Sequence, residues 1–490
     1  MKLLIYSLLL LVMVAGELNA QQILTLDDAM NIAMKNSPDI IKSELNMTIS
    51  RENLNAREAA TKSLIKFRLT PFTYSQTREF SSFFSAWNTT ETKGAGGDLS
   101  ITQPIKLTDG RIGLENRFSY QEVYSSLQDT TTKDYINNLF LSYSQPIFTY
   151  NKLRMELKQL RLSLENATLS YAIQRLYLER QVTQYFYTVY QRKMSLAVAE
   201  EELKNQQTSF DIIKSKVEGG LSAREELLQA ELNLATSESN LQNAQVELAN
   251  AKDNFKQYIG MPLNEELDIQ TDTAFAEVMV DMEKAIQNGL DTRMELRQRE
   301  IELQNSQDQL VVAKSTNEFA GNIDLSIGLV GIDPALADIY NKPTRSPQVT
   351  VTLDIPIWDW GVRKSKIKAA QAAIKIEEIN LEAERTNVEL GIRQTFRSLQ
   401  NLSMQIEIAR QNEKNALLTY EINLERYKNG DLTSMDLGRY QNQLSEKKMN
   451  LANSLISYKL ELLNMKIQSL WDFENNISFV PRELQENLSE

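Results

Sequence analysis

The chain contains no cysteine and no histidine among its 490 residues. It therefore cannot form a disulfide, a thiol nucleophile, a serine–histidine–aspartate triad or an ordinary zinc site. A lipid anchor on an N-terminal cysteine is excluded for the same reason. The net charge is −12, so the sequence lacks the basic excess of nucleic-acid-binding proteins and predicts no such partner. No phosphate-binding loop, EF-hand or HExxH motif occurs, and we expect no cofactor, no bound metal and no catalytic residue.

Long hydrophobic runs are also missing. The run from Leu3 to Val14 is too short to cross a bilayer as a helix. It follows Lys2 and precedes small residues, which is the pattern of a secretory signal peptide cleaved after Ala20. No later segment approaches about 18 consecutive apolar residues. We therefore expect an exported chain that can enter a membrane only with β-strands.

What the chain does have is a duplication. An alternating strand pattern ends in Pro-Ile-aromatic and leads into a long helical pattern at Pro146 and again at Pro356, 210 positions later. A second matched pair begins at Phe210 (FDIIKSKVEGGLS) and at Tyr420 (YEINLERYKNGDLT), with the same separation. Two copies of one unit indicate a pseudo-symmetric protomer, and this governs the prediction of the fold.

The pattern of apolar residues, turn residues and breaks divides the chain into four parts. We expect a signal peptide over 1–20, a first repeat over 21–277, a second repeat over 278–470 and a loose C-terminal tail over 471–490. In the first repeat we expect strands within 64–148 and helices over 25–62, 149–217 and 222–259. In the second repeat we expect strands within 322–357 and helices over 280–315, 361–428 and 433–470.

The two repeats differ in their strand regions. Pro38 matches Met294 at a separation of 256, whereas the separation is 210 after the strands. The first repeat therefore carries 46 extra residues within its strand region, which leaves its number of strands open. Alternate positions of the second strand region are polar and suit a water-filled lumen opposite an apolar lipid-facing side: Asp324, Ser326, Gly328, Thr350, Thr352 and Asp354.

Helix packing also has a signature. Leucines recur every seven residues from Leu227 to Leu248, and Phe255 continues the series. Small residues such as Ala230 and Ala244 follow three positions later. A sustained seven-residue repeat is typical of a left-handed coiled coil, in which small residues allow the backbones to approach closely.

Together these features resemble the TolC-like outer-membrane efflux proteins, in a variant typical of the Bacteroidetes. The resemblance covers about residues 22–470. It rests on the signal peptide, on the order and spacing of the repeats, on the junctions Gln145–Phe148 and Ile355–Trp358, and on the turns Gly219–Ser222 and Asn429–Leu432. It implies a mainly α fold with a transmembrane β-barrel part. Each strand-and-long-helix protomer of a trimer would contribute to one shared barrel, continuous with a coiled-coil tunnel.

The resemblance also implies a function, a location and partners. The chain would be the outer-membrane exit duct of a tripartite efflux or type I secretion system, a passive conduit from the periplasm to the exterior for small molecules or polypeptides. It would lie in the outer membrane, in contact with its lipid, with a periplasmic helical tunnel. Besides the homotrimer, its partners would be a periplasmic adaptor protein and an inner-membrane transporter of the RND or ABC type.

The site residues follow from the same resemblance. At the periplasmic aperture, Tyr427 matches the family's aperture tyrosine and Asp436 its first aperture aspartate, and Glu226 lies where the companion turn carries an acid. The family's latch arginine and second aperture aspartate correspond to Leu432 and Arg439, so that latch is not carried over. Asp431 and Arg439 could form a substitute pair. The turn residues expected to contact the adaptor are Gly220, Leu221, Gly430 and Leu432.

Structural roles compete with these assignments. Asp436 lies three positions after Thr433, and Glu225 three after Ser222, so both fit helix-capping boxes. Gly220 also fits a helix C-cap with Leu221 packed beneath it. The competing functions are a periplasmic coiled-coil scaffold without pore activity and an exported carboxylate hydrolase. The hydrolase needs two acids about 5–10 Å apart in a pocket, and no domain of the sequence offers one.

Overall fold

The structure is a computed structural model that describes residues 22–481 except 271–275, 342 and 430. The expected signal peptide lies outside the described residues. The chain forms two compact units. Of the described residues, one unit contains 22–47, Ala167–Gln298 and 381–481, and the other contains Thr48–Asn166 and Arg299–Asn380. None of the helices in the described residues is long and apolar enough to cross a membrane.

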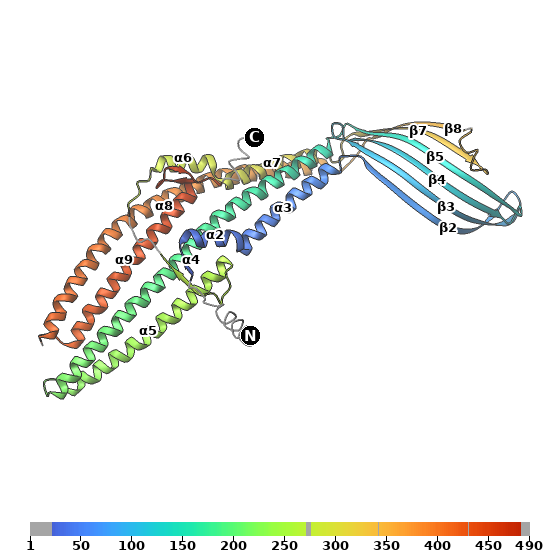
Figure 1. The fold of residues 1–490 in the computed structure, drawn as a ribbon. Coiled ribbons are helices and arrows are strands. Elements are labelled where there is room, and N and C mark those ends of the chain that lie inside the picture. Colours follow the sequence, from blue (N-terminus) through green and yellow to red (C-terminus); the bar gives the residue numbers. More distant parts are fainter. Residues whose placement is uncertain (1–21, 271–275, 342, 430, 482–490) are drawn as a thin grey trace, which may run out of the picture. The chain divides into compact units, whose positions relative to one another are not determined.

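The duplication appears first in the long helices (Figure 1). Helices α4 (Lys152–Glu218) and α8 (Val362–Lys428) each contain 67 residues and begin 210 positions apart. Helices α5 (Arg224–Ile259) and α9 (Ser434–Ser469) each contain 36 residues with the same separation. Each repeat therefore has a long helix that turns back at its end into a shorter one.

The remaining helices form matched pairs as well, but each pair is interrupted. Residues 25–62, expected as one helix, form α2 (Leu26–Asn36) and α3 (Pro38–Ala59). Residues 280–315 likewise form α6 (Met282–Thr292) and α7 (Met294–Lys314).

The interruptions share one geometry. Ser37 and Arg293, 256 positions apart, have extended backbones with ψ of 125°. Their N–H groups donate to the carbonyls of Ala33 and Gly289 at 2.9 and 3.1 Å. Proline after Ser37 explains the first break, because a residue that precedes proline avoids the α conformation. Arg293 has no such neighbour. Its guanidinium instead donates to the side chain of Glu295 and lies against Gln468 at the end of α9.

Six strands form one antiparallel sheet in the order β2-β3-β4-β5-β7-β8 (Figure 1). Their bounds are β2 Leu64–Ser81, β3 Ala86–Ile105, β4 Gly110–Ser125, β5 Thr130–Ile147, β7 Ala320–Asp333 and β8 Thr344–Asp354. The first repeat thus contributes four strands and the second contributes two. The separations of 256 and 210 match β2 to β7 and β5 to β8. The 46 extra residues therefore account for the hairpin β3–β4, inserted between the two strands that both repeats share.

The register gives the sheet two unlike faces. One row across all six strands consists of apolar residues: Ile65, Ile101, Leu114, Leu141, Ile327 and Pro347. The adjacent row, which points to the opposite face because side chains alternate along a strand, is mostly polar: Leu64, Thr102, Gly113, Ser142, Ser326 and Gln348. This arrangement of a polar and an apolar face is typical of strands between water and lipid.

Two hydrophobic cores lie in the unit that holds most of the helices. One surrounds Phe186 and Phe255, where α2 and α5 pack against α4. The other surrounds Ile392 and Met465, where α6 packs against α8 and α9. A short parallel pair, β1 (Gln22–Leu24) and β6 (Leu267–Ile269), joins the first core. The segment 261–277, expected to be irregular, therefore contains a strand.

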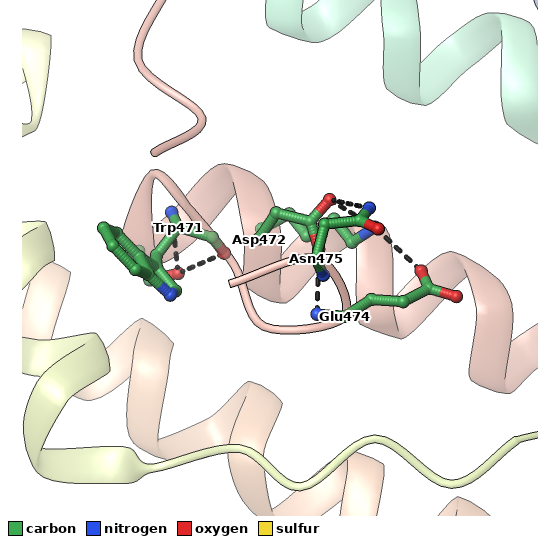
Figure 2. A network of polar contacts seen from close by, with 6 residues as sticks. Trp471, Asp472, Glu474 and Asn475 are labelled. Carbon is green, nitrogen blue, oxygen red and sulfur yellow. Dashed lines mark hydrogen bonds and ion pairs between the residues drawn. The ribbon is translucent and has the colours of Figure 1, made fainter. Parts of the chain in front are cut away.

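The tail expected after residue 470 begins with an ordered hairpin of β9 (Trp471–Asp472) and β10 (Ile477–Ser478). Figure 2 shows the network that holds it. Asp472 is 6% exposed, accepts hydrogen bonds from the backbone N–H groups of Glu474 and Asn475, and pairs with Lys466 of α9 at 3.1 Å. The ammonium of Lys284 lies 4.0 Å from the ring centre of Trp471, which ties the hairpin to α6. The described part of this segment is therefore anchored.

Candidate functional site

The first candidate surface is the turn between α4 and α5. Gly220 has a φ of 74°, its N–H donates to the carbonyl of Val217 at 3.0 Å, and Leu221 N–H donates to Lys216 at 2.7 Å. These two bonds form a Schellman motif, whose left-handed position favours glycine. Leu221 is nevertheless 83% exposed. The glycine is thus a C-cap, as its alternative role requires, but the leucine does not pack beneath it in the single chain.

The second tip, between α8 and α9, has a related turn. Asp431 N–H donates to the carbonyl of Arg426 at 2.9 Å, the same spacing as the Leu221 bond. Gly430 lies outside the described residues. Leu432 is half-buried, so the two tips expose their leucines to different degrees.

Tyr427 lies one helical turn before the second tip, and its ring is 3% exposed. Its hydroxyl shares a hydrogen bond with Ser209 of α4 at 3.2 Å, and the ammonium of Lys216 lies 5.3 Å from the ring centre. Burial raises the pKa of the phenol, the Ser209 bond lowers it, and the carboxylate of Glu226 raises it further. Within one chain, Tyr427 therefore joins α8 to α4 as a neutral, packed side chain.

Asp436 stands in the first turn of α9, where the structure gives it a capping role. Its N–H donates to Thr433 Oγ1 at 3.2 Å, and that hydroxyl donates to Asp436 Oδ2 at 2.8 Å. A carboxylate in the first turn also interacts favourably with the helix dipole. The capping contact involves Oδ2 of the carboxylate alone.

The equivalent turn of α5 differs from its expected form. The N-cap is Ala223, which makes no side-chain capping bond, so the predicted capping box of Ser222 and Glu225 is wrong. The hydroxyl of Ser222 donates instead to the carboxylate of Glu226. Glu226 is thereby held over the turn, near Tyr427.

The suggested pair of Asp431 and Arg439 is not formed. Within the described residues no ion pair joins them, and both side chains are exposed. Asp431 is in the turn, whereas Arg439 lies further along α9. The backbone N–H of Asp431 donates to the carbonyl of Arg426 and anchors the turn, and the carboxylate forms no side-chain hydrogen bond with the described residues.

Two residues of this site were missed by the sequence reasoning: Ser209 and Lys216 of α4, the contacts of Tyr427. The duplication carried a partial signal. Tyr427 corresponds to Val217 in the first repeat. The two repeats therefore differ at this position, which marks Tyr427 as a residue whose contacts are not shared by the first repeat. Nothing in the spacing shows which residues of α4 receive it, because that depends on how two helices pack.

The outer surfaces of the helices carry apolar residues with coiled-coil spacing. On α8, Ile376, Leu390, Met404 and Leu418 recur every 14 residues and are 56%, 48%, 62% and 49% exposed. On α5, Leu232 and Val246 are also 14 apart and 63% and 60% exposed. Fourteen residues are two heptads, so each row follows one seam of a supercoil. No helix in the described part of the chain covers these residues.

The sequence profile of the family described as outer membrane efflux protein matches residues 110–261 and 285–465, about two thirds of the chain. The chain belongs to the outer membrane efflux protein family. Members of this family are transport channels, and the assignment gives the protein an outer-membrane location with a periplasmic helical tunnel. A search of curated protein sequences gave no match.

Solved structures agree in fold. The outer membrane channel CmeC of Campylobacter jejuni is 14% identical, with a TM-score of 0.68, over 95% of this chain and 88% of that chain. The outer membrane protein VceC of Vibrio cholerae is 14% identical, with a TM-score of 0.67, over 92% and 97%. The open state of the MtrE channel of Neisseria gonorrhoeae is 12% identical, with a TM-score of 0.65, over 90% and 88%. The predicted fold class is therefore confirmed.

Proposed function

We propose that three copies of this chain form the exit duct of a tripartite efflux or secretion system, through which small molecules or polypeptides pass from the periplasm to the exterior. The observation that carries the proposal is the sheet with two open edges. Within the described residues, β2 pairs only with β3, and β8 only with β7. Unpaired edges this long invite pairing with another chain.

The polarity of the edge strands suits closure. The six strands alternate in direction, so β2 and β8 run oppositely, and β8 of one copy can pair antiparallel with β2 of the next. Six strands from each of three copies make a barrel of 18 strands. Barrels of about 16–18 strands leave a water-filled channel, and the polar face of this sheet would line it.

The uncovered seams of α5 and α8 support the same assembly. Their exposed residues follow the coiled-coil period, and a helix of another copy packed side by side would cover them. The apolar rows continue along most of α8, which favours a long tunnel over a local contact. The family assignment favours this duct over the periplasmic scaffold.

The helical tips are the proposed contact with a periplasmic adaptor, which would connect the duct to an inner-membrane transporter. Leu221, presented on a rigid glycine turn, is an apolar side chain with no cover. Replacing Leu221 with Asp is expected to abolish efflux in cells while leaving single-channel conductance unchanged. Leu263→Asp serves as control, because Leu263 is similarly exposed, at 61%, in the turn at the other end of α5. Equal loss of efflux in both variants would contradict the proposal that Leu221 contacts the adaptor.

At the aperture, Asp436 from three copies would bring like charges together near the axis, which favours cations. The test is the protomer count and the conductance of the purified mature protein in a planar bilayer. A trimer whose conductance rises in Asp436→Asn supports both the duct and the acidic gate. A trimer whose conductance is unchanged in Asp436→Asn supports the duct, contradicts the acidic gate and leaves Asp436 with its capping role alone. A non-trimeric protein without conductance supports the scaffold.

A further inference from the structure

The junction between β8 and α8 has an ordered sequence of side-chain types. The apolar row of β8, Val349, Val351 and Leu353, continues with the same alternation through Ile355 and Ile357, and all five are 48% to 92% exposed. Trp358 and Trp360 follow, 74% and 88% exposed, with ring centres 5.7 Å apart. Four basic residues come next: Arg363, Lys364, Lys366 and Lys368.

This order matches the layers of a lipid leaflet. Aliphatic side chains belong beside the hydrocarbon, tryptophans at the interface, and lysines among the headgroups. The chain therefore crosses the three layers within about twenty residues, in the direction from the strand toward the periplasmic helix. The exposure of both indoles makes packing between helices of the same chain an inadequate account of them.

Three of the four basic residues have no acidic partner among the described residues. From Trp360 to Ile376 the sequence contains no aspartate or glutamate, although the whole chain carries a net charge of −12. Arg363 is used locally, since it donates to Glu318 and to the carbonyl of Lys314. Lys364, Lys366 and Lys368 are exposed and form no ion pair with the described residues. Trp358, Trp360, Lys364 and Lys368 line an open groove of about 640 Å³.

The first repeat carries the same pattern at matched positions. Phe148 and Tyr150 correspond to Trp358 and Trp360, and Arg154 and Lys158 to Lys364 and Lys368, all at a separation of 210. Lys158 pairs there with Asp308 at 2.8 Å, whereas Arg154 has an exposed side chain and no ion pair with any residue that the structure describes. Cations at the same two positions of both repeats are not explained by pairing with the described residues, among which only Lys158 of the four has a carboxylate partner.

We propose that the start of α8 binds phosphate headgroups of phospholipids in the periplasmic leaflet of the outer membrane, with Lys364, Lys366 and Lys368 as phosphate contacts and Trp358 and Trp360 placed at the interface beneath them. The start of α4 is a weaker copy of this site, in which Arg154 is the cation without an acidic partner in the described part of the chain. The proposal rests on the outer-membrane location and is independent of cargo, adaptor and gate.

The test uses the full mature protein purified in a neutral detergent and titrated with phosphatidylglycerol, with bound lipids per protomer counted by native mass spectrometry. The triple variant Lys364→Gln, Lys366→Gln, Lys368→Gln is expected to lose on the order of 100-fold in affinity, at roughly five-fold for each cation near a lipid surface. The triple change of the same lysines to Arg is expected to retain binding.

A matched control removes three positive charges from the same helix. Lys375, Arg385 and Arg393 each pair with a glutamate on α8 itself, so changing all three to Gln is expected to leave lipid affinity unchanged. Equal loss in both triple variants would overturn the proposal, because the effect would then follow net charge alone. Unchanged lipid affinity in the test variant would also overturn the proposal. If the affinity is unchanged and the protomer count falls, the junction is an interface between copies and not a lipid site.

Two further arms separate a lipid site from a free-phosphate site. Phosphatidylglycerol with brominated acyl chains is expected to quench tryptophan fluorescence, and Trp358→Phe with Trp360→Phe is expected to remove most of that quenching. Inorganic phosphate at millimolar concentration is expected to leave the lipid bound. Displacement of the lipid by inorganic phosphate, without quenching by the brominated lipid, would overturn the assignment to a membrane lipid.

Discussion

The two halves of the chain have the same helices and different sheets. Their long and short helices agree in length to the residue, and their N-caps Thr25 and Asp281, like their breaks at Ser37 and Arg293, are 256 positions apart. The sheet contribution, in contrast, is four strands against two. Helices in a packed tunnel have to match their neighbours along their whole length, whereas a sheet accepts added strands if their number is even. Duplication thus preserved the part with the stricter geometry.

The number of inserted strands must be even because of the directions in which the flanking strands run. β2 leads away from the helices and β5 leads back to them. An insertion between them must therefore contain as many strands running toward the helices as away from them, as β3 and β4 do. The strands also differ in length, since β2 to β5 span 16 to 20 residues and β8 spans 11. About 9–11 residues of a strand suffice to cross a membrane. The strands of the first repeat are therefore long enough to extend beyond the bilayer.

The largest expected effects come from changing the number of strands in the first repeat. Deleting residues 83–128 removes the β3–β4 hairpin and joins Ser82 to Asp129, and the protein is expected to remain an outer-membrane channel. Its barrel diameter should fall to about two thirds, because diameter grows with strand number. Deleting Ala86–Ile105 alone is expected to abolish insertion.

The readouts are outer-membrane content and the largest polyethylene glycol that enters from the extracellular side. The idea that the hairpin forms part of the lumen wall fails if the 46-residue deletion leaves that size limit unchanged. It also fails if the single-strand deletion inserts normally.

A second comparison concerns the ends of the short helices. Lys466 pairs with the buried Asp472, whereas the equivalent Lys256 pairs with Asp253, whose side chain is 57% exposed. Asp472→Asn is expected to lower the free energy of unfolding by about 3 kcal/mol, as for a broken buried pair. Asp253→Asn is expected to cost less than about 1 kcal/mol. Heat unfolding in detergent, followed by circular dichroism, gives both values.

The pH dependence of this pair has a defined sign. Burial raises the pKa of Asp472, but the hydrogen bonds from Asn475 and the pairing with Lys466 outweigh it and leave the pKa below its usual range. The stabilisation is therefore present above about pH 4 and is lost as the pH falls through the lowered pKa. The difference between the protein and Asp472→Asn should shrink accordingly. A difference that stays constant down to pH 2 would contradict this role of the charge.

The third comparison is between Gly289 and its counterpart Ala33, both fully buried small positions. A Cβ at Gly289 would lie 2.6 Å from Ile392 Cδ1 and 3.2 Å from the carbonyl oxygen of Gln468. Gly289→Ala is therefore expected to destabilise the fold by about 1 kcal/mol through overpacking, despite the better helix propensity of alanine. Ala33→Gly should cost a similar amount for the opposite reason. Stabilisation by Gly289→Ala in the same heat-unfolding assay would show that α6 can move away from α8.

The smallest expected effect is at Glu202 of α4, whose counterpart in α8 is the neutral Asn412. Burial raises the pKa of Glu202, and a hydrogen bond with Ser237 lowers it by less. The charged carboxylate is thus destabilising at neutral pH, and Glu202→Gln is expected to raise the free energy of unfolding by under about 1 kcal/mol. The gain should vanish below about pH 4, where the carboxyl is protonated in both states. Glu200→Gln, on the same helix, is the control; a loss of stability in Glu202→Gln would contradict the sign.

Several sequence predictions agree with the structure because they rest on local patterns. The turns near Gly219 and Asn429 separate the long and short helices, and the expected sheet lies between α3 and α4 and between α7 and α8. Glycines and apolar periodicity mark such boundaries wherever they occur. Both helix breaks, at Ser37 and at Arg293, were missed. Pro38 is a local signal of the first break that the prediction of one helix over 25–62 did not use. At Arg293 no proline follows, and the contacts with Glu295 and Gln468 depend on the tertiary structure.

At the candidate site, the sequence pointed to the tips but not to their contacts. The alternatives for Asp436 and Gly220 included the caps that the structure has. The capping box at Ser222 does not form, and within the described residues of one chain Asp431 and Arg439 do not pair. Caps depend on three or four consecutive residues, so their possible forms can be enumerated. The burial of Tyr427 against Ser209 joins residues 218 positions apart, and no local pattern specifies that contact.

The sequence by itself determined the duplication, the lengths of α4, α5, α8 and α9, the extra 46 residues and the order of apolar, aromatic and basic residues at the junctions, because each is a property of neighbouring positions. Only the tertiary structure decided that the extra residues form one hairpin, that β5 pairs with β7 across more than 170 residues, that Leu221 is uncovered and that Tyr427 is buried. Those outcomes depend on strand register and helix packing, which select among many partners that are locally equivalent.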